Sequence, residues 1–247
     1  MLTFRNHFNI SNNMRLLLLS NSTNPGEEYL SWPKEEIQKF LGSQPTTALF
    51  IPYAAVTFAY DEYEAKVESR FAELGHHITS IHHAPNPVQA VIEAEAIVIG
   101  GGNTWQLVRK MHENKLMEAI REKVLNGTPY IGWSAGSNVA CPTLRTTNDM
   151  PITDPLSFDT LNLIPFQINP HFTDFHPAGH GGETREDRIN EFITLNPDIY
   201  VVGLREATLL RRETNQLELV GNRSARLFKK GEIFREFNPG EDLSFLL

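Results

Sequence analysis

The sequence predicts an α/β fold with three layers, in which helices cover both faces of a mostly parallel sheet. Short apolar runs bounded by turn residues alternate with stretches of helical periodicity. The runs are continuously apolar, as expected for strands that are buried on both faces. The expected strands are residues 15–20, 48–51, 78–81, 96–100 and 130–132.

Helices are expected between and after these strands. Residues 61–74 repeat apolar side chains at helical spacing, and residues 103–112 and 116–125 predict two helices separated near Asn114. The Thr184–Asp187 segment resembles a capping box, which predicts the start of a later helix. The alternation of strands and helices favours the parallel arrangement.

The second half of the chain departs from this alternation. Residues 141–182 are rich in Pro, Asn, Asp and His, and we expect a long functional loop there. Residues 199–204 predict a further strand. Residues 208–212, 216–220 and 225–229 alternate and turn like antiparallel strands at a sheet edge.

Composition restricts the possible partners and the compartment. The 22 basic and 30 acidic residues give a net charge of −8, which argues against binding to nucleic acid or an anionic membrane. One cysteine, Cys141, rules out an intramolecular disulfide and favours the cytoplasm. No apolar run is long enough for a membrane helix. We interpret residues 1–13, which are polar, as an N-terminal extension and 14–247 as a single domain.

A candidate nucleophile lies directly after the strand at 130–132. Gly132-Trp133-Ser134-Ala135-Gly136 is a G-x-S-x-G pattern between a strand and an expected helix at 137–140. Such a turn lifts the serine hydroxyl above the sheet and aims the Ala135 amide at a reacting carbonyl. The alternative is a glycine-rich packing turn without chemistry.

A second glycine-rich turn predicts the other half of an oxyanion hole. A strand runs into Gly100-Gly101-Gly102 and then into a helix, so free amides would lie at the sheet's carboxyl edge. Gly101 or Gly102 would then act together with Ala135. A phosphate-binding loop is the alternative, although neither standard phosphate motif is present.

The serine needs a base, and only three histidines follow it: His171, His176 and His180. His171 comes just after an apolar segment that would fix its position, so it is the expected base. The three histidines could instead bind zinc, although they have no obvious carboxylate partner.

An acid is expected to orient the imidazole. Glu206 follows the strand at 199–204 and would lie at the same carboxyl edge. From the chemistry alone, Asp149, Asp154 and Asp159 remain alternatives to it.

Several blocks of sequence together resemble the aspartyl dipeptidases of the S51 family of serine peptidases. The resemblance spans Met14 to Phe234. The blocks are Leu16–Thr23, Ile51–Thr57, Val98–Leu107, Tyr130–Ile152, Ile168–Thr173 and Gly182–Ile189.

The resemblance implies a Ser–His–Glu triad of Ser134, His171 and Glu206. The implied fold is flavodoxin-like, similar to class I glutamine amidotransferases, with no metal and no cofactor. Gly102 and Ala135 match the oxyanion positions of the family.

The resemblance also implies residues that bind the substrate. Arg185 matches a residue that holds the aspartate side chain of the substrate, and Asp149 lies where it could meet the free amino group. Two positions beside the expected acid depart from the family pattern: Arg205 stands where proline is expected, and Ala207 where glycine is expected.

The expected function is therefore a serine dipeptidase that hydrolyses α-aspartyl dipeptides (Asp-Xaa) through an acyl-enzyme. A related hydrolase of cyanophycin or β-aspartyl peptides is one alternative, and an anion-binding module without catalysis is another. A transferase like the glutamine amidotransferases would need cysteine at position 134. The expected partners are small peptides with N-terminal aspartate, with monomer and homodimer both open.

Overall fold

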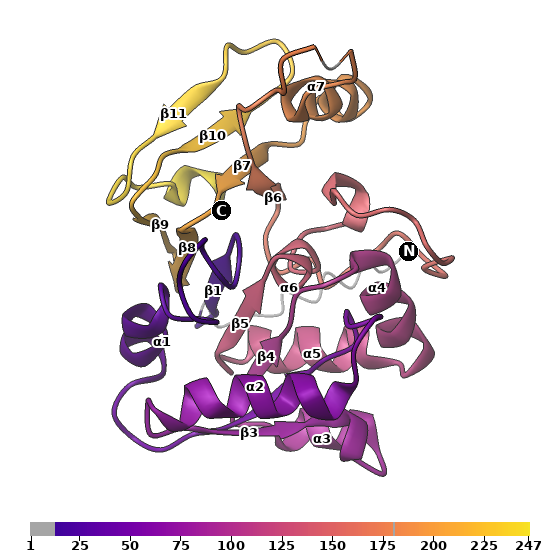
Figure 1. Ribbon diagram of the computed structural model, residues 1–247, viewed down its shortest axis with the longest axis vertical. Helices are drawn as coiled ribbons and strands as arrows, with labels where there is room; N and C mark the ends of the chain where they lie inside the picture. Colours follow the sequence, from indigo (N-terminus) through magenta and orange to yellow (C-terminus); the bar gives the residue numbers. More distant parts are fainter. Residues whose placement is uncertain (1–12, 180) are drawn as a thin grey trace, which may run out of the picture.

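The computed structural model describes residues 13–179 and 181–247, and the strands in this range form two sheets (Figure 1). The larger sheet has seven strands. Their spatial order is β3 (His77–Ser80), β2 (Thr47–Ile51), β4 (Ala96–Ile99), β5 (Tyr130–Trp133), β1 (Arg15–Leu19), β8 (Thr208–Glu213) and β9 (Gln216–Gly221). The smaller sheet contains, in order, β11 (Arg235–Phe237), β10 (Ala225–Phe228), β7 (Val201–Arg205) and β6 (Gln167–Phe172).

Helices and short 3₁₀ turns connect these strands. The helices are α1 (Lys34–Leu41), α2 (Tyr60–Ala72), α3 (Pro87–Glu93), α4 (Thr104–Glu113), α5 (Leu116–Leu125), α6 (Ala135–Asn138) and α7 (Arg185–Leu195). The turns are η1 (Ile81–His83), η2 (Leu144–Thr146) and η3 (Ser244–Leu246). No helix in the described ranges is both long and apolar enough to span a bilayer.

The core lies on both faces of the larger sheet. Leu16 and Leu18 of β1 pack in one apolar cluster with residues of α3, α4 and α5. Leu17 and Leu19, which point the opposite way, pack with residues of α1 and α2. The predicted α/β sandwich with helices on both faces is therefore confirmed.

The predicted parallel strands all form, and β1 to β5 pair parallel to one another. The predicted break between α4 and α5 is also present, at Lys115, whose φ of 57° is left-handed. The capping box at Thr184 forms as predicted, because the Thr184 hydroxyl accepts from the Asp187 amide and the Asp187 carboxylate accepts from Thr184.

Two parts of the prediction were wrong. Residues 141–182 are not one long loop, since β6 lies within them and pairs parallel with β7. Its sequence, Gln-Ile-Asn-Pro-His-Phe, hides the strand because a proline and polar residues interrupt the apolar pattern. The 225–229 strand does not extend the larger sheet either. As β10, it joins β7 in the smaller sheet.

The N-terminal extension expected at residues 1–13 lies, except for Asn13, outside the described residues.

Candidate active site

Ser134 occupies a strained turn between β5 and α6. Its backbone has φ 51° and ψ −110°, a combination that non-glycine residues rarely adopt. The turn is held in place because the Ser134 amide donates to the Leu19 carbonyl at 3.1 Å. Close packing leaves no room for a larger residue at Gly136, where a Cβ would lie 2.1 Å from the Ile99 carbonyl oxygen. This geometry matches the predicted G-x-S-x-G turn.

Ser134, His171 and Glu206 form a continuous line of contacts. His171 Nε2 lies 3.0 Å from Ser134 Oγ, and His171 Nδ1 lies 2.8 Å from Glu206 Oε1. A carboxylate that accepts the Nδ1–H leaves Nε2 free to accept the serine proton. The arrangement can therefore generate a nucleophilic alkoxide at Ser134.

The candidate base, His171, comes from the smaller sheet and is held by the residue that follows β1 of the larger one. His171 has a left-handed φ of 54°, at a bulge where β6 shifts its register against β7. Its amide donates to Ser20 Oγ at 2.9 Å, and the Ser20 hydroxyl donates to the Leu204 carbonyl at 2.7 Å. Ser20, directly after β1, thus joins the two sheets beneath the imidazole.

The segment that carries Glu206, the candidate acid, is fixed in the same way. The amide of Ala207, the residue after Glu206, donates to Asn21 Oδ1 at 2.9 Å. Ala207 has a φ of 61°, in the left-handed region that favours glycine. This conformation explains physically why glycine is the expected residue at position 207.

Arg205, which replaces an expected proline, anchors the other side of Glu206. Its guanidinium pairs with Asp174 at 2.6 Å and with Glu236 at 2.8 Å. Arg226 also contacts both carboxylates. Burial raises the pKa of Glu236, but hydrogen bonds from Arg205, Ser224 and Arg226 outweigh it and lower this pKa to about 2.

The glycine-rich turn after β4 lies beside the serine. Gly102 has a φ of 137°, and a Cβ there would lie 2.3 Å from the Ala54 carbonyl oxygen, so only glycine fits. A Cβ on Gly101 would lie 3.1 Å from Ser134 Cβ. The amides of Gly102 and Ala135 donate to no acceptor within the described residues. Two unpaired donors near a nucleophile can stabilise an oxyanion.

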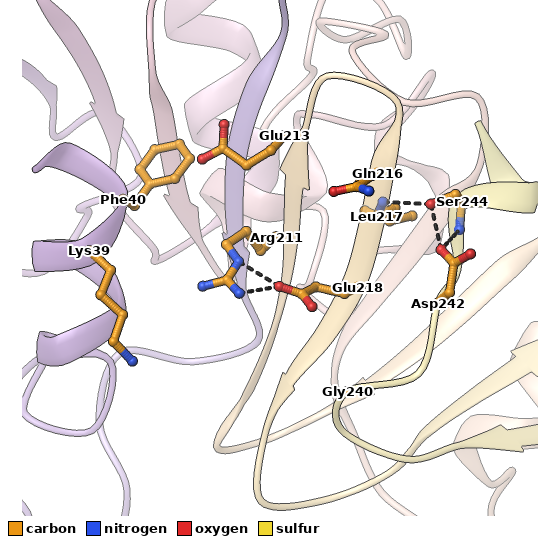
Figure 2. A pocket seen from close by; sticks show the side chains of 10 residues that line it. All are labelled: Lys39, Phe40, Arg211, Glu213, Gln216, Leu217, Glu218, Gly240, Asp242 and Ser244. Carbon is orange, nitrogen blue, oxygen red and sulfur yellow. Dashed lines mark hydrogen bonds and ion pairs between the residues drawn. The ribbon is translucent and has the colours of Figure 1, made fainter.

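A cavity of about 640 Å³ opens at the triad. Its lining residues are Ser22, Tyr29, Phe58, Glu62, Tyr63, Lys66, Gly101, Gly102, Trp133, Ser134 and His171. A second cavity, of about 540 Å³, contains none of the predicted site residues (Figure 2). Its charges already pair within the protein, since Arg211 contacts Glu36 and Glu218.

Arg185, at the start of α7, is connected to the base through Asn148. Arg185 Nη1 donates to Asn148 Oδ1 at 2.6 Å, and Asn148 Nδ2 donates to the Pro170 carbonyl at 2.6 Å, next to His171. The half-buried guanidinium forms no ion pair with any described residue. Burial and the nearby charge of Arg188 lower the pKa of Arg185, while Asp149 raises it by a smaller amount.

Asp149 connects the segment between η2 and β6 to the start of α4. Its Oδ2 accepts hydrogen bonds from the Thr104 amide at 2.7 Å, the Thr104 hydroxyl at 2.6 Å and the Thr147 hydroxyl at 3.0 Å. Thr104, which Asp149 contacts, lies two residues after Gly102. Glu206 hydrogen-bonds to His171, whereas Asp149, Asp154 and Asp159, which all lie in the described range, do not.

Sequence reasoning missed Ser20, Asn21 and Asn148 as residues that position the site. A signal for the first two was present, because both follow a buried strand at the sheet edge that carries the nucleophile. Asn148 carried no comparable signal, since its role depends on Arg185, which is distant in sequence. His180, part of the alternative zinc set, lies outside the described residues.

Comparison with known proteins identifies the family of this chain. The profile of peptidase family S51 matches residues 16–220. Peptidase E from Nostoc sp. is 55% identical over 233 residues, covering 94% of this chain and 96% of that protein. Peptidase E from Salmonella typhimurium is 48% identical over 219 residues, covering 89% of this chain and 95% of that protein.

The fold also matches solved structures. A peptidase from an acI-B1 Actinobacterium superposes with a TM-score of 0.71 at 21% identity, covering 95% of this chain and 98% of that chain. A putative Peptidase E from Listeria monocytogenes gives a TM-score of 0.55 at 21% identity, covering 91% of this chain and 99% of that one. Together with the family match and the close relatives, the geometry at Ser134 leads to one conclusion. The chain belongs to peptidase family S51 and is a serine-type peptidase.

Proposed function

We propose that this peptidase is a dipeptidase that releases N-terminal aspartate from Asp-Xaa dipeptides through an acyl-enzyme on Ser134. The observation that supports this substrate class is the environment of Arg185. Its half-buried guanidinium contacts the neutral side chain of Asn148 and pairs with no carboxylate among the described residues. A partly desolvated cation that is linked to the backbone beside His171 through Asn148 favours a carboxylate ligand, and the planar guanidinium can bind it with two hydrogen bonds.

In the first half of the reaction, Ser134 Oγ attacks the carbonyl carbon of the aspartyl residue. His171 Nε2 takes the serine proton, and Glu206 stabilises the imidazolium that forms. The carbonyl oxygen becomes an oxyanion that accepts hydrogen bonds from the Gly102 and Ala135 amides. The imidazolium then protonates the leaving amine, and the second residue departs.

In the second half, water hydrolyses the aspartyl ester. His171 removes a proton from the water as it attacks the ester carbonyl, and returns the proton to Ser134 as the C–O bond breaks. The 3.0 Å contact between Nε2 and Oγ serves both steps. No step in this scheme needs a metal or a cofactor.

Asp149 is the proposed partner of the substrate's free amino group. One of its oxygens is held by Thr104 and Thr147, which leaves Oδ1 without a hydrogen bond to the described residues. A carboxylate fixed on one side presents its other oxygen in a defined direction, and so suits a cationic amine. Hydrolysis of cyanophycin or of β-aspartyl peptides remains the second candidate, because the same cation would bind either kind of aspartyl group.

The proposed compartment is the cytoplasm, and the proposed unit of function is residues 14–247 as one domain. Support for the single domain comes from the larger apolar cluster, which includes Leu16 of β1 together with Val202 and Leu227 of the smaller sheet. The only cysteine, Cys141, is buried and unpaired.

Hydrolysis of Asp-Leu, Glu-Leu, Ala-Leu and β-Asp-Leu by the purified chain tests the proposal. We expect Asp-Leu to be the preferred substrate, with Ser134→Ala inactive and Arg185→Lys reduced by at least about tenfold in kcat/KM. Arg188→Lys is the matched control, since Arg188 lies on the same helix and pairs with Glu183. Equal rates on Asp-Leu and Ala-Leu would overturn the substrate class, and equal losses in the two lysine variants would remove Arg185 from the site.

A further inference from the structure

A second group of chemically active side chains lies away from the triad. Asp61 and Glu64 come from the first turns of α2, and His82 and His83 come from η1 directly after β3. One ligand atom from each of these four residues lies within 4.8 Å of the other three. Among the described residues, this is the one place where such a group forms.

The two imidazoles converge on the same carboxylate. His82 Nε2 lies 2.8 Å from Asp61 Oδ1, and His83 Nε2 lies 3.3 Å from the same oxygen. His83 Nε2 also lies 2.8 Å from Glu64 Oε2. Four ligands around one zinc ion lie about 3.3 Å apart, because Zn–N and Zn–O bonds are about 2.0–2.2 Å. The group therefore needs only small side-chain movements to enclose an ion.

Contacts outside the group already orient two of these ligands. His82 Nδ1 lies 2.6 Å from Ser80 Oγ, which directs Nε2 toward Asp61. The other oxygen of Glu64, Oε1, accepts the Ser80 amide at 2.8 Å, which directs Oε2 toward His83. Metal-binding histidines and carboxylates are commonly oriented in this way by a partner on their far side. The His82 and Glu64 side chains are 16% and 20% exposed, whereas those of Asp61 and His83 are 77% and 59% exposed, so an ion would enter from the solvent side.

We propose that Asp61, Glu64, His82 and His83 form a binding site for a divalent transition-metal ion, with zinc as the best fit. Two imidazole nitrogens and two carboxylate oxygens are a donor set that zinc accepts in tetrahedral geometry. Two neutral imidazoles and two carboxylates also balance the charge of a divalent cation. Magnesium and calcium are disfavoured, because both prefer oxygen ligands only.

The ion would connect α2 to the segment that follows β3. Asp61 and Glu64 share α2 with Tyr63, whose hydroxyl donates to the Gly101 carbonyl at 3.0 Å and accepts from Trp133 Nε1 at 3.0 Å. The same helix therefore carries the metal ligands on one side and a wall of the catalytic cavity on another. The role of the ion is to hold α2 in place, and it takes no part in acyl transfer.

Titration of the metal-free chain with zinc, followed by calorimetry, tests the site. We expect one zinc ion per chain at Asp61, Glu64, His82 and His83, with a dissociation constant of about 10 μM or lower, and no comparable binding of magnesium. Cobalt should give the intense visible bands of a tetrahedral site. Asp61→Asn and Glu64→Gln keep the shape of each side chain, and each should weaken zinc binding at least about tenfold.

His77→Ala is the matched control. His77 contacts the Glu68 carboxylate at 3.3 Å, so it forms a similar histidine–carboxylate pair between β3 and α2, outside the group. Zinc binding should be unchanged in this variant. His83→Ala should remove the cobalt bands while hydrolysis of the preferred dipeptide without metal stays at the wild-type rate, which shows that the variant is folded. Absence of zinc binding by the wild type, or an equal loss in His77→Ala and His83→Ala, would overturn the proposal.

Discussion

The amide of His171 donates a hydrogen bond to Ser20 Oγ, and this contact joins β6 of one sheet to the end of β1 in the other. The Ser20 hydroxyl donates its own hydrogen bond to the Leu204 carbonyl, two residues before Glu206. One small side chain therefore holds the backbone of both His171 and the strand that precedes Glu206. Neither of these hydrogen bonds involves Ser134.

Ser20→Ala should lower kcat by about 10- to 100-fold and leave KM for the preferred dipeptide nearly unchanged, because a small displacement of the imidazole slows proton transfer without changing the binding groups. Steady-state kinetics on folded protein provide the measurement. Ser31→Ala is the control, since the Ser31 hydroxyl makes no hydrogen bond to a described residue. A rise in KM with unchanged kcat would contradict this role.

Ala207→Gly should raise the free energy of unfolding by up to about 1 kcal/mol. A left-handed conformation costs a non-glycine residue about 1–2 kcal/mol, and the greater freedom of glycine in the unfolded chain returns part of that gain. Urea unfolding of the variant and the wild type gives the difference. In contrast, Ala72→Gly at the end of α2 should destabilise the protein by up to about 1 kcal/mol. Destabilisation by Ala207→Gly would show that the turn is not strained.

Glu236→Gln should destabilise the protein at neutral pH, and its difference from the wild type should shrink as the pH falls. The pKa of Glu236 is lowered from 4.5 to about 2, so its ionised form is favoured in the folded state. The stabilisation is therefore complete above about pH 4.5 and is lost as the pH falls toward 2. Unfolding curves between pH 3 and 7 provide the measurement. Glu232→Gln, at a carboxylate with no ion pair to a described residue, should show no such trend.

Cys141 should not react with thiol reagents in the native protein at pH 8. Burial raises its pKa to about 12, so the reactive thiolate is almost absent, and the sulfur accepts the Ile168 amide at 3.1 Å inside the core. Ellman's reagent should modify about one thiol per chain only after denaturation. The Cys141→Ser variant, which has no thiol, provides the blank for this labelling. Rapid labelling of the native wild type would show that this part of the core opens readily.

The part of the site that is local in sequence was predictable. The turn around Ser134 and the glycines before α4 follow strands whose apolar runs are clear, so the nucleophile and the expected oxyanion donors could be located from motifs. The larger sheet was predictable for the same reason. Its parallel strands are short and apolar, and α2, α4 and α5 between them have clear helical periodicity.

The part that depends on contacts between distant segments was not predictable. β6 escaped detection because Pro170 and His171 break its apolar pattern, although both serve the site once β7 lies alongside. The pairing of β10 with β7 could not be inferred from alternation alone, which does not specify a partner. The network of Arg205 with Asp174 and Glu236 likewise joins residues from three separate segments.

The division of the catalytic residues between two sheets has a consequence for the newly made chain. Ser134 directly follows β5 of the seven-stranded sheet, whereas His171 lies on β6 of the four-stranded sheet and Glu206 lies in the turn from β7 to β8. Neither sheet alone holds a nucleophile with its base. A chain that has emerged from the ribosome only as far as Ser134 still lacks β6 and the imidazole that contacts Ser134 in the folded protein. Under the proposed mechanism, the chain therefore becomes active only when both sheets have formed.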